Sequence, residues 1–186
     1  MKSDPIPFSD LTETTRSSKE VYRGKMLTVH EDVVVLSNGR PALREYILHP
    51  GAVIIIAQLD NDDVVLERQF RYPLRRHMIE LPAGKIDPGE APLVTAQREL
   101  LEETGYEAAQ WEHIATVHPS VGYADEHIEL YRARGLTLRQ RKFDEGELLD
   151  VFTLPLAEAL NWVESGRISD VKTVAGLFWL ERLSRS

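Results

Sequence analysis

Four glutamates lie close together in a stretch that has the sequence of a single helix, and this arrangement constrains the fold more than any other feature of the chain. They are Glu90, Glu99, Glu102 and Glu103. Pro88-Gly89 favours a turn before the stretch, Pro92 suits the first helical position, and Gly105 suits the residue just past the helix end. The sequence therefore predicts one helix over residues 92–104, with three carboxylates near its C-terminus.

These three glutamates share one side of the predicted helix, because residues three and four apart stack on each other. Like charges at this spacing destabilise a helix by ~0.2–0.5 kcal/mol per pair, and a helix C-terminus favours cations. A hard divalent cation would offset both effects, since Mg²⁺, Mn²⁺ and Ca²⁺ prefer oxygen ligands. The alternative, an ordinary solvated acidic face, is favoured for an isolated Glu-x-x-x-Glu pair. A second face is expected to pack against a sheet and contains Leu93, Ala96 and Leu100.

The wider pattern around the glutamates resembles the signature of the Nudix hydrolases, whose members split a diphosphate linked to another group with the help of a divalent metal. The signature is Gly, five residues, Glu, seven residues, then Arg-Glu-apolar-x-Glu-Glu-x-Gly-apolar. The chain matches every specified position from Gly84 to Tyr106 if Tyr106 counts as apolar. The family more often has an aliphatic residue there, a departure that bears on packing and not on the chemistry.

The resemblance implies a metal site and a reaction. The metal ligands would be the carbonyl of Ala83 and the carboxylates of Glu99 and Glu103, with Glu102 close by among the catalytic groups. The cofactor would be Mg²⁺, or Mn²⁺, with two or more ions per site. A water activated by the metal would displace AMP or ribose 5-phosphate from phosphorus.

Two further groups of this site follow from the same resemblance. Glu90 and Arg98 would form a charge pair that orients the neighbouring carboxylates. A general base is expected in the acidic segment 144–147, with Glu145 as the first choice and Glu147 as a base or a further metal ligand. An ordinary solvated turn is the alternative interpretation of that segment.

Segments outside the signature resemble the ADP-ribose pyrophosphatase branch of the family. They comprise residues 67–73, 80–87, 118–123 and 144–147. The implied substrate is ADP-ribose or a similar nucleoside diphosphate sugar. Two alternatives stay open: another nucleoside diphosphate derivative, such as GDP-mannose, a dinucleoside polyphosphate or an oxidised nucleotide, and a regulatory module that binds a nucleotide sugar without cleaving it.

Candidate substrate ligands lie around these segments. Arg68 and Arg71 would hold the diphosphate, because a guanidinium binds phosphate through two hydrogen bonds. Glu126 matches a position that binds the terminal ribose in relatives, and Arg44 matches one that reaches the adenine from a partner subunit. The resemblance therefore also implies a homodimer with exchanged N-terminal β segments.

Composition limits the remaining possibilities. A net charge of −8 argues against general nucleic-acid binding, which needs a basic surface. The chain has no cysteine, which fits a reducing compartment, and its longest strongly apolar run, residues 52–57, is too short to span a bilayer. We expect a soluble cytoplasmic protein with neither nucleic-acid nor membrane partners.

The chain of 186 residues is long enough for one domain with an extension. Residues 1–17 are polar and expected to be flexible, residues 18–50 form a β segment too small to bury a core alone, and residues 51–186 form the main domain. Alternating and apolar runs predict strands at 19–23, 27–36, 42–48, 52–58, 64–69, 112–117, 128–134 and 148–153, and helices at 156–165 and 170–183. The fold class is α/β, and the resemblance implies a Nudix-type α/β/α sandwich with a mixed sheet.

Overall fold

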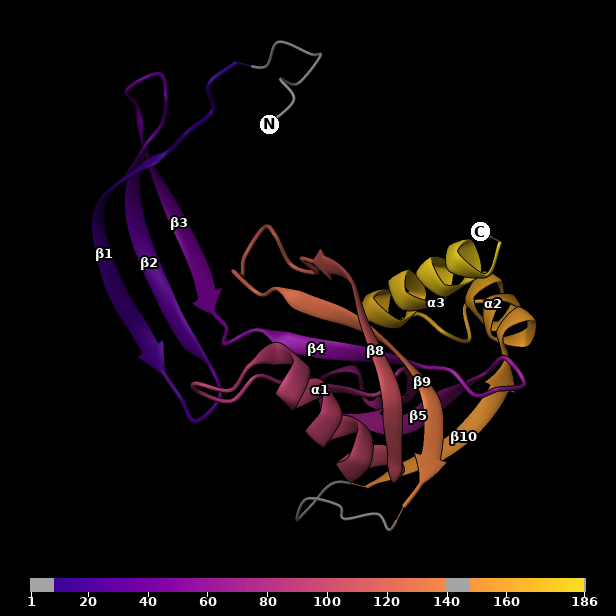
Figure 1. The fold of residues 1–186 in the computed structure, drawn as a ribbon. Coiled ribbons are helices and arrows are strands. Elements are labelled where there is room, and N and C mark those ends of the chain that lie inside the picture. Colours follow the sequence, from indigo (N-terminus) through magenta and orange to yellow (C-terminus); the bar gives the residue numbers. More distant parts are fainter. Residues whose placement is uncertain (1–8, 140–147, 186) are drawn as a thin grey trace. The chain divides into compact units, whose positions relative to one another are not determined.

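The computed structural model describes residues 9–139 and 148–185 (Figure 1). The chain divides into two compact units. An N-terminal unit contains residues up to His49 together with Ser120–Asp125, and a second unit, called the main unit below, contains Pro50–Pro119 and the residues from Glu126 onward. Each helix in the described part of the chain is too short or too polar to cross a membrane.

The N-terminal unit is a three-stranded antiparallel sheet in the order β1-β2-β3. Its strands are β1 (Thr14–Arg23), β2 (Thr28–Val35) and β3 (Pro41–Leu48). The first strand begins within the segment expected to be flexible, because Thr14 pairs with Val35 of β2 and so extends the ladder. The segment Ser120–Asp125 joins this unit through hydrogen bonds from the backbone amide of Ile47 to the carbonyl of Tyr123 and from that of His49 to Asp125.

The main unit contains two sheets (Figure 1). One has the order β7-β4-β9-β8 and is mixed, since β4 and β9 run parallel and the other neighbours run antiparallel. The other, β10-β5-β6, is antiparallel. The strands are β4 (Ala52–Ala57), β5 (Asp63–Arg71), β6 (Arg76–Glu80), β7 (Ala83–Lys85), β8 (Tyr106–Val117), β9 (Ile128–Leu138) and β10 (Leu149–Pro155).

Strand β4 lies between two cores, because successive side chains of a strand point to opposite faces. Ile54 and Ile56 pack on one face, and Val53 and Ile55 pack on the other. The first core includes residues of α2 (Leu156–Glu164) and α3 (Val171–Ser184), and the second includes residues of α1 (Pro92–Glu99). Helices thus cover both faces of a mixed sheet, which confirms the predicted α/β class.

The glutamate-bearing helix starts and stops where the sequence predicts, but its last part differs. It begins at Pro92, and Gly105 ends it in the left-handed conformation with φ 79°. The α-helix itself ends at Glu99 and continues as a π-helical turn, η2 (Leu100–Thr104). Such wide turns often mark functional sites. Of the expected apolar face, Ala96 and Leu100 are buried, whereas Leu93 is exposed.

Other boundaries differ for reasons of tertiary pairing. Strand β8 starts six residues before the predicted 112–117 because Tyr106 pairs with Leu138 at the far end of β9. The short strands β6 and β7 were not expected, since one is polar and the other has three residues including a glycine. A short 3-10 helix, η1 (Tyr72–Leu74), joins β5 to β6.

Helix α3 approaches the segment between β6 and β7 closely. A Cβ atom at Gly176 would lie 2.7 Å from the Cδ1 of Leu81, which is fully buried. The hydroxyl of Thr173 also accepts a hydrogen bond from the backbone amide of Leu81 at 2.9 Å. The absence of a side chain at position 176 therefore lets α3 rest against this segment.

Replacing Gly176 by valine is expected to destabilise the fold, because the added side chain overlaps Leu81 in a packed core. Overpacking of this kind costs ~1–3 kcal/mol, which lowers the melting temperature of a chain of this size by about 5 °C. Thermal unfolding followed by circular dichroism measures the change. Gly122→Ala is the control, because a Cβ there meets no atom within 4 Å. Equal melting temperatures for Gly176→Val and wild type would contradict this packing.

Candidate active site

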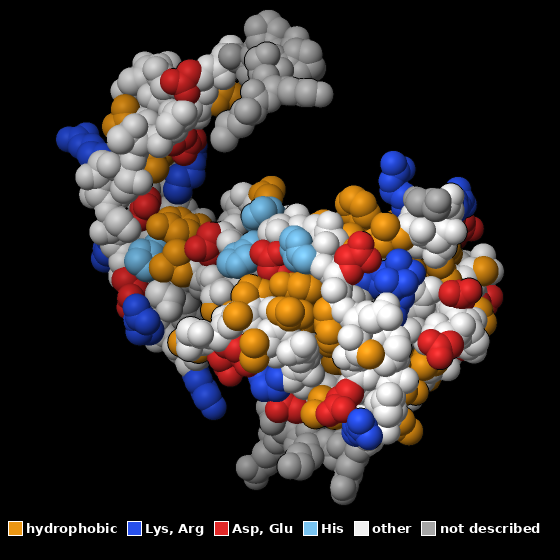
Figure 2. All heavy atoms as spheres, in the orientation of Figure 1, with side chains coloured by type: hydrophobic (Ala, Val, Ile, Leu, Met, Phe, Trp, Pro, Cys, Tyr) orange, Lys and Arg blue, Asp and Glu red, His pale blue; other side chains and the backbone are white. Residues whose placement is uncertain are grey.

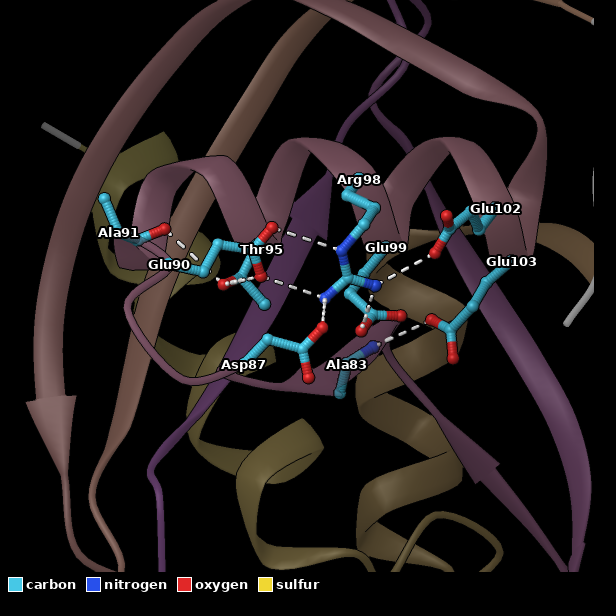
Figure 3. Close-up of polar contacts among 9 residues, drawn as sticks. All are labelled: Ala83, Asp87, Glu90, Ala91, Thr95, Arg98, Glu99, Glu102 and Glu103. Atoms are coloured by element: carbon cyan, nitrogen blue, oxygen red, sulfur yellow. Dashed lines mark hydrogen bonds and ion pairs between the residues drawn. The ribbon is translucent and has the colours of Figure 1, made fainter.

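Two of the predicted metal ligands converge on strand β7 (Figure 3). The carboxyl carbon of Glu99 lies only 2.0 Å from where a Cβ of Gly84 would stand. The Oε2 atom of Glu103 accepts a hydrogen bond from the backbone amide of Ala83 at 3.1 Å. Glu103 is buried, with 5% of its surface exposed. The helix and β7 thus bring the Glu99 and Glu103 carboxylates to the backbone of Ala83 and Gly84.

Arg98 links the carboxylates of this segment to one another (Figure 3). It donates from Nε and Nη2 to Glu90 at 3.2 and 3.1 Å, and from Nη1 to Glu99 at 2.8 Å and to Glu102 at 2.9 Å. Asp87 lies 3.9 Å from the same guanidinium. These bonds, first among them those to Glu90, raise the pKa of Arg98, so it stays charged. The predicted Glu90–Arg98 pair is therefore present as part of a larger cluster.

The cluster carries more negative than positive charge. Arg98 faces three glutamates, Glu90, Glu99 and Glu102, together with Asp87, and Glu90 also accepts a hydrogen bond from the hydroxyl of Thr95 at 2.7 Å. The hydrogen bonds from Arg98 and then Thr95 lower the pKa of Glu90, which keeps this carboxyl ionised. One guanidinium cannot balance so many carboxylates.

This donor set fits a hard divalent cation, which binds carboxylate and carbonyl oxygen. The fit rests on the buried Glu103, on Glu99 against Gly84, and on their common approach to Ala83. Within residues 9–139 and 148–185, no three His, Asp or Glu side chains already surround one point as they do around a bound ion. Here Glu99 and Glu102 instead direct an oxygen to Arg98.

The two arginines expected at the diphosphate lie on β5 and each has an acidic partner. Arg71 donates from Nε and Nη2 to the two carboxylate oxygens of Glu80 at 2.7 and 2.9 Å. These bonds, and to a smaller extent the charge of Glu103, raise the pKa of Arg71. Arg68 pairs with Asp150 at 3.1 Å. Arg71 is therefore close enough to the carboxylate cluster to be influenced by Glu103.

The remaining predicted residues lie in different parts of the chain. Arg44 belongs to the N-terminal unit, where it pairs with Glu13, and Glu126 belongs to the main unit, just before β9. Glu145 and Glu147 lie outside the described residues. Their assignments, like the general base, remain predictions.

Sequence reasoning missed several polar residues that the structure places around the site. Lys172 and Asp170 lie at the start of α3, where Lys172 pairs with both Glu80 and Asp170, and Thr95 donates a hydrogen bond to Glu90. Glu80 lies in the segment 80–87, which resembles the ADP-ribose pyrophosphatase branch, but the resemblance assigned no role to this residue. No sequence pattern indicates a role for Lys172, because its partner Glu80 lies 92 residues earlier in the chain.

Comparison with known proteins gives a consistent result. Residues 48–175 match the NUDIX domain, and residues 13–47 match the nucleoside diphosphate sugar hydrolase N-terminal domain. The chain is 42% identical to a methanol dehydrogenase activator of Bacillus methanolicus, over 91% of this chain and 92% of that protein. It is 38% identical to an ADP-ribose pyrophosphatase of Bacillus subtilis (strain 168), over 94% and 95% respectively. A crystal structure of an ADP compounds hydrolase superposes with a TM-score of 0.85 at 25% identity, covering 96% of this chain and 97% of the other.

A side chain at position 84 should disable the site without unfolding the protein. In Gly84→Ala the methyl group displaces the Glu99 carboxylate, and a displacement of about 1 Å can cost a hundredfold in rate. We expect kcat to fall ~100-fold, as measured by hydrolysis of a nucleoside diphosphate sugar, with an unchanged far-ultraviolet circular dichroism spectrum. Gly122→Ala is the matched control. Full activity of Gly84→Ala would show that Glu99 has room elsewhere.

Removing the central cation should invert the pH dependence of stability. In the wild type the pKa of Glu90 is lower in the folded protein than in the unfolded chain. This difference stabilises the fold at pH values above the unfolded-state pKa, and the stabilisation is lost as the pH falls through the folded-state pKa. In Arg98→Met the crowded carboxylates repel one another, so their pKa values rise and stability is lost as pH increases. The melting temperature of the variant should therefore fall further below that of the wild type at pH 8 than at pH 5.

Two additions test this explanation. Mg²⁺ should restore part of the lost stability of Arg98→Met, because it supplies positive charge to the same oxygens. Arg139→Met, which breaks an exposed pair with Glu107, should show no such pH dependence. A deficit in Arg98→Met that is equal at both pH values would mean that Arg98 acts through packing and not through charge.

Proposed function

The chain belongs to the Nudix hydrolase family, and from this premise we propose that it hydrolyses the diphosphate bond of ADP-ribose, giving AMP and ribose 5-phosphate. It is a hydrolase of nucleoside diphosphate sugars of the ADP-ribose type, since residues 48–175 match the NUDIX domain, residues 13–47 match the nucleoside diphosphate sugar hydrolase N-terminal domain, and two of its relatives are ADP-ribose pyrophosphatases. The structural observation that supports the proposal is the convergence of Glu99 and Glu103 on Ala83 and Gly84.

Enzymes of this family depend on a divalent metal, and we propose Mg²⁺, with Mn²⁺ as a substitute and two or more ions per site. The carbonyl of Ala83 and the carboxylates of Glu99 and Glu103 would hold it. When bound, the cation neutralises the diphosphate and lowers the pKa of a water nucleophile. Glu102, which shares Arg98 with Glu99, would stand beside these ligands.

The residues of the chain would then orient the substrate and move one proton. Arg71 and Arg68 bind the diphosphate oxygens, because each presents a fork of donors that matches a phosphate. Glu145 accepts the proton of the attacking water, and Glu147 is the alternative base. Arg98 stays in place and holds the carboxylates, since its hydrogen bonds fix their orientation.

Two further parts of the proposal concern the rest of the substrate. Glu126 contacts the terminal ribose. Arg44 contacts the adenine of the partner's substrate in a homodimer that exchanges its N-terminal sheets. The match of residues 13–47 to an N-terminal domain of nucleoside diphosphate sugar hydrolases supports a role for this unit in substrate recognition.

Purified protein should release AMP from ADP-ribose in the presence of Mg²⁺ and lose this activity in EDTA, since without the cation the carboxylates repel the anionic diphosphate. Chromatography of the nucleotide products measures both. A competitive panel with GDP-mannose, a dinucleoside polyphosphate and an oxidised nucleotide ranks the other substrates. Tight ADP-ribose binding with negligible turnover would instead favour a regulatory role.

Glu103→Gln separates the site from the scaffold, because it removes an anionic ligand at nearly constant volume. We expect kcat to fall by ~100-fold or more, since the loss of a ligand weakens transition-state charge neutralisation by several kcal/mol. The melting temperature without metal should stay close to that of the wild type. Glu181→Gln, at an ion pair on α3, is the matched control. Unfolding of the metal-free Glu103→Gln protein would mean that this carboxylate is structural.

A further inference from the structure

Glu80, at the end of β6, is a buried carboxylate with two cationic partners. Its side chain is 5% exposed. It accepts both hydrogen bonds from Arg71 and a third from Lys172, which also pairs with Asp170 at 2.9 Å. Burial raises the pKa of Glu80, but the Arg71 hydrogen bonds and the Lys172 charge outweigh it, so the net pKa is lowered. The carboxylate is therefore ionised and firmly held.

Residues 81–83 connect Glu80 to the carboxylates around Arg98, and a backbone group of each of these residues forms a hydrogen bond. The amide of Leu81 donates to the hydroxyl of Thr173, and the carbonyl of Pro82 accepts from the amide of Ile55 at 2.8 Å. The amide of Ala83 then donates to Glu103. Because these backbone groups have fixed partners, the position of Glu80 relative to the cluster is fixed as well.

Glu80 contacts only one edge of the Arg71 guanidinium. The Glu80 carboxylate accepts hydrogen bonds from Nε and Nη2, and in the described part of the chain Nη1 makes no hydrogen bond. The Arg71 side chain stays 44% exposed while its partner carboxylate is buried. Arg71 therefore has a held edge and an open edge, which is how a guanidinium can be fixed in place and still bind an oxyanion.

We propose that Glu80, itself held by Lys172, is a positioning residue that presents the Nη1 edge of Arg71 to the substrate diphosphate. The proposal rests on the proposed function, because it assigns Arg71 to that diphosphate. Lys172 acts through Glu80: it donates to Oε2, the oxygen that also accepts from Nη2 of Arg71, and it balances the carboxylate charge that Arg71 would otherwise have to neutralise alone.

Positioning and simple charge attraction predict opposite results. Arg71, Lys172, Glu80 and Asp170 together carry two positive and two negative charges. Glu80→Gln leaves this group with one net positive charge. Attraction alone would then strengthen the binding of an anionic diphosphate. Loss of positioning would weaken it, because Arg71 becomes free to adopt other rotamers.

Steady-state kinetics on ADP-ribose distinguish the two. In Glu80→Gln we expect KM to rise about tenfold with kcat changed less than about threefold, since the lost charge-assisted hydrogen bonds orient a binding group. In an Arg71→Ala background the same substitution should have no further effect on KM. Glu181→Gln is the control. An unchanged or lower KM in Glu80→Gln overturns the proposal.

A binding measurement keeps the test independent of turnover and of folding. Calorimetric titration with ADP in the presence of Ca²⁺ should give weaker binding for Glu80→Gln than for wild type, and equal affinities overturn the proposal. If Glu80→Gln fails to fold, Lys172→Met gives the same comparison with a smaller loss of affinity, and equal affinity there also overturns it. A wild type that leaves ADP-ribose intact refutes the proposed function, whereas the ADP comparison still decides the role of Glu80.

Discussion

The sharing of one guanidinium among several carboxylates is the interaction on which the site depends. Arg98 bonds to Glu90, Glu99 and Glu102 at once, so it fixes their directions and cancels part of their repulsion. It cannot cancel all of it, and the remaining negative charge at Glu99 and Glu103 is what suits the place to a divalent cation. A second arginine here would stabilise the resting protein and would remove the reason for a metal to bind.

The same balance recurs on the neighbouring strands with another purpose. Glu80 is surrounded by Arg71 and Lys172, so its charge is fully compensated, whereas the carboxylates near β7 are under-compensated. An acidic protein that handles an anionic substrate needs both arrangements. In the proposed function, the under-compensated carboxylates would bind a divalent cation, and the compensated Glu80 would keep the Arg71 guanidinium oriented toward the substrate.

Sequence reasoning predicted the parts of the molecule that depend on local spacing. The helix start at Pro92 and its stop at Gly105 follow from short-range pattern, as do the bounds of α2 and α3 within one residue, whereas the Glu90–Arg98 pair follows from the family resemblance. The parts that it missed depend on contacts between distant segments. Strand β7 exists because it pairs with β4, and Lys172 reaches Glu80 only through the packing of α3. The π-helical turn carries no sequence mark that we recognise.

Two positions of the signature require glycine for different physical reasons, and the reason determines which substitutions each position can accept. Gly105 is required by its left-handed backbone, a conformation that asparagine also tolerates, so position 105 has an acceptable replacement. Gly84 is required by volume, because the Glu99 carboxylate occupies the space of a side chain. Positions 84 and 99 can therefore vary only as a pair. A larger residue at 84 demands a shorter one at 99, and a lineage that takes this step moves or loses the carboxylate that we propose as a metal ligand.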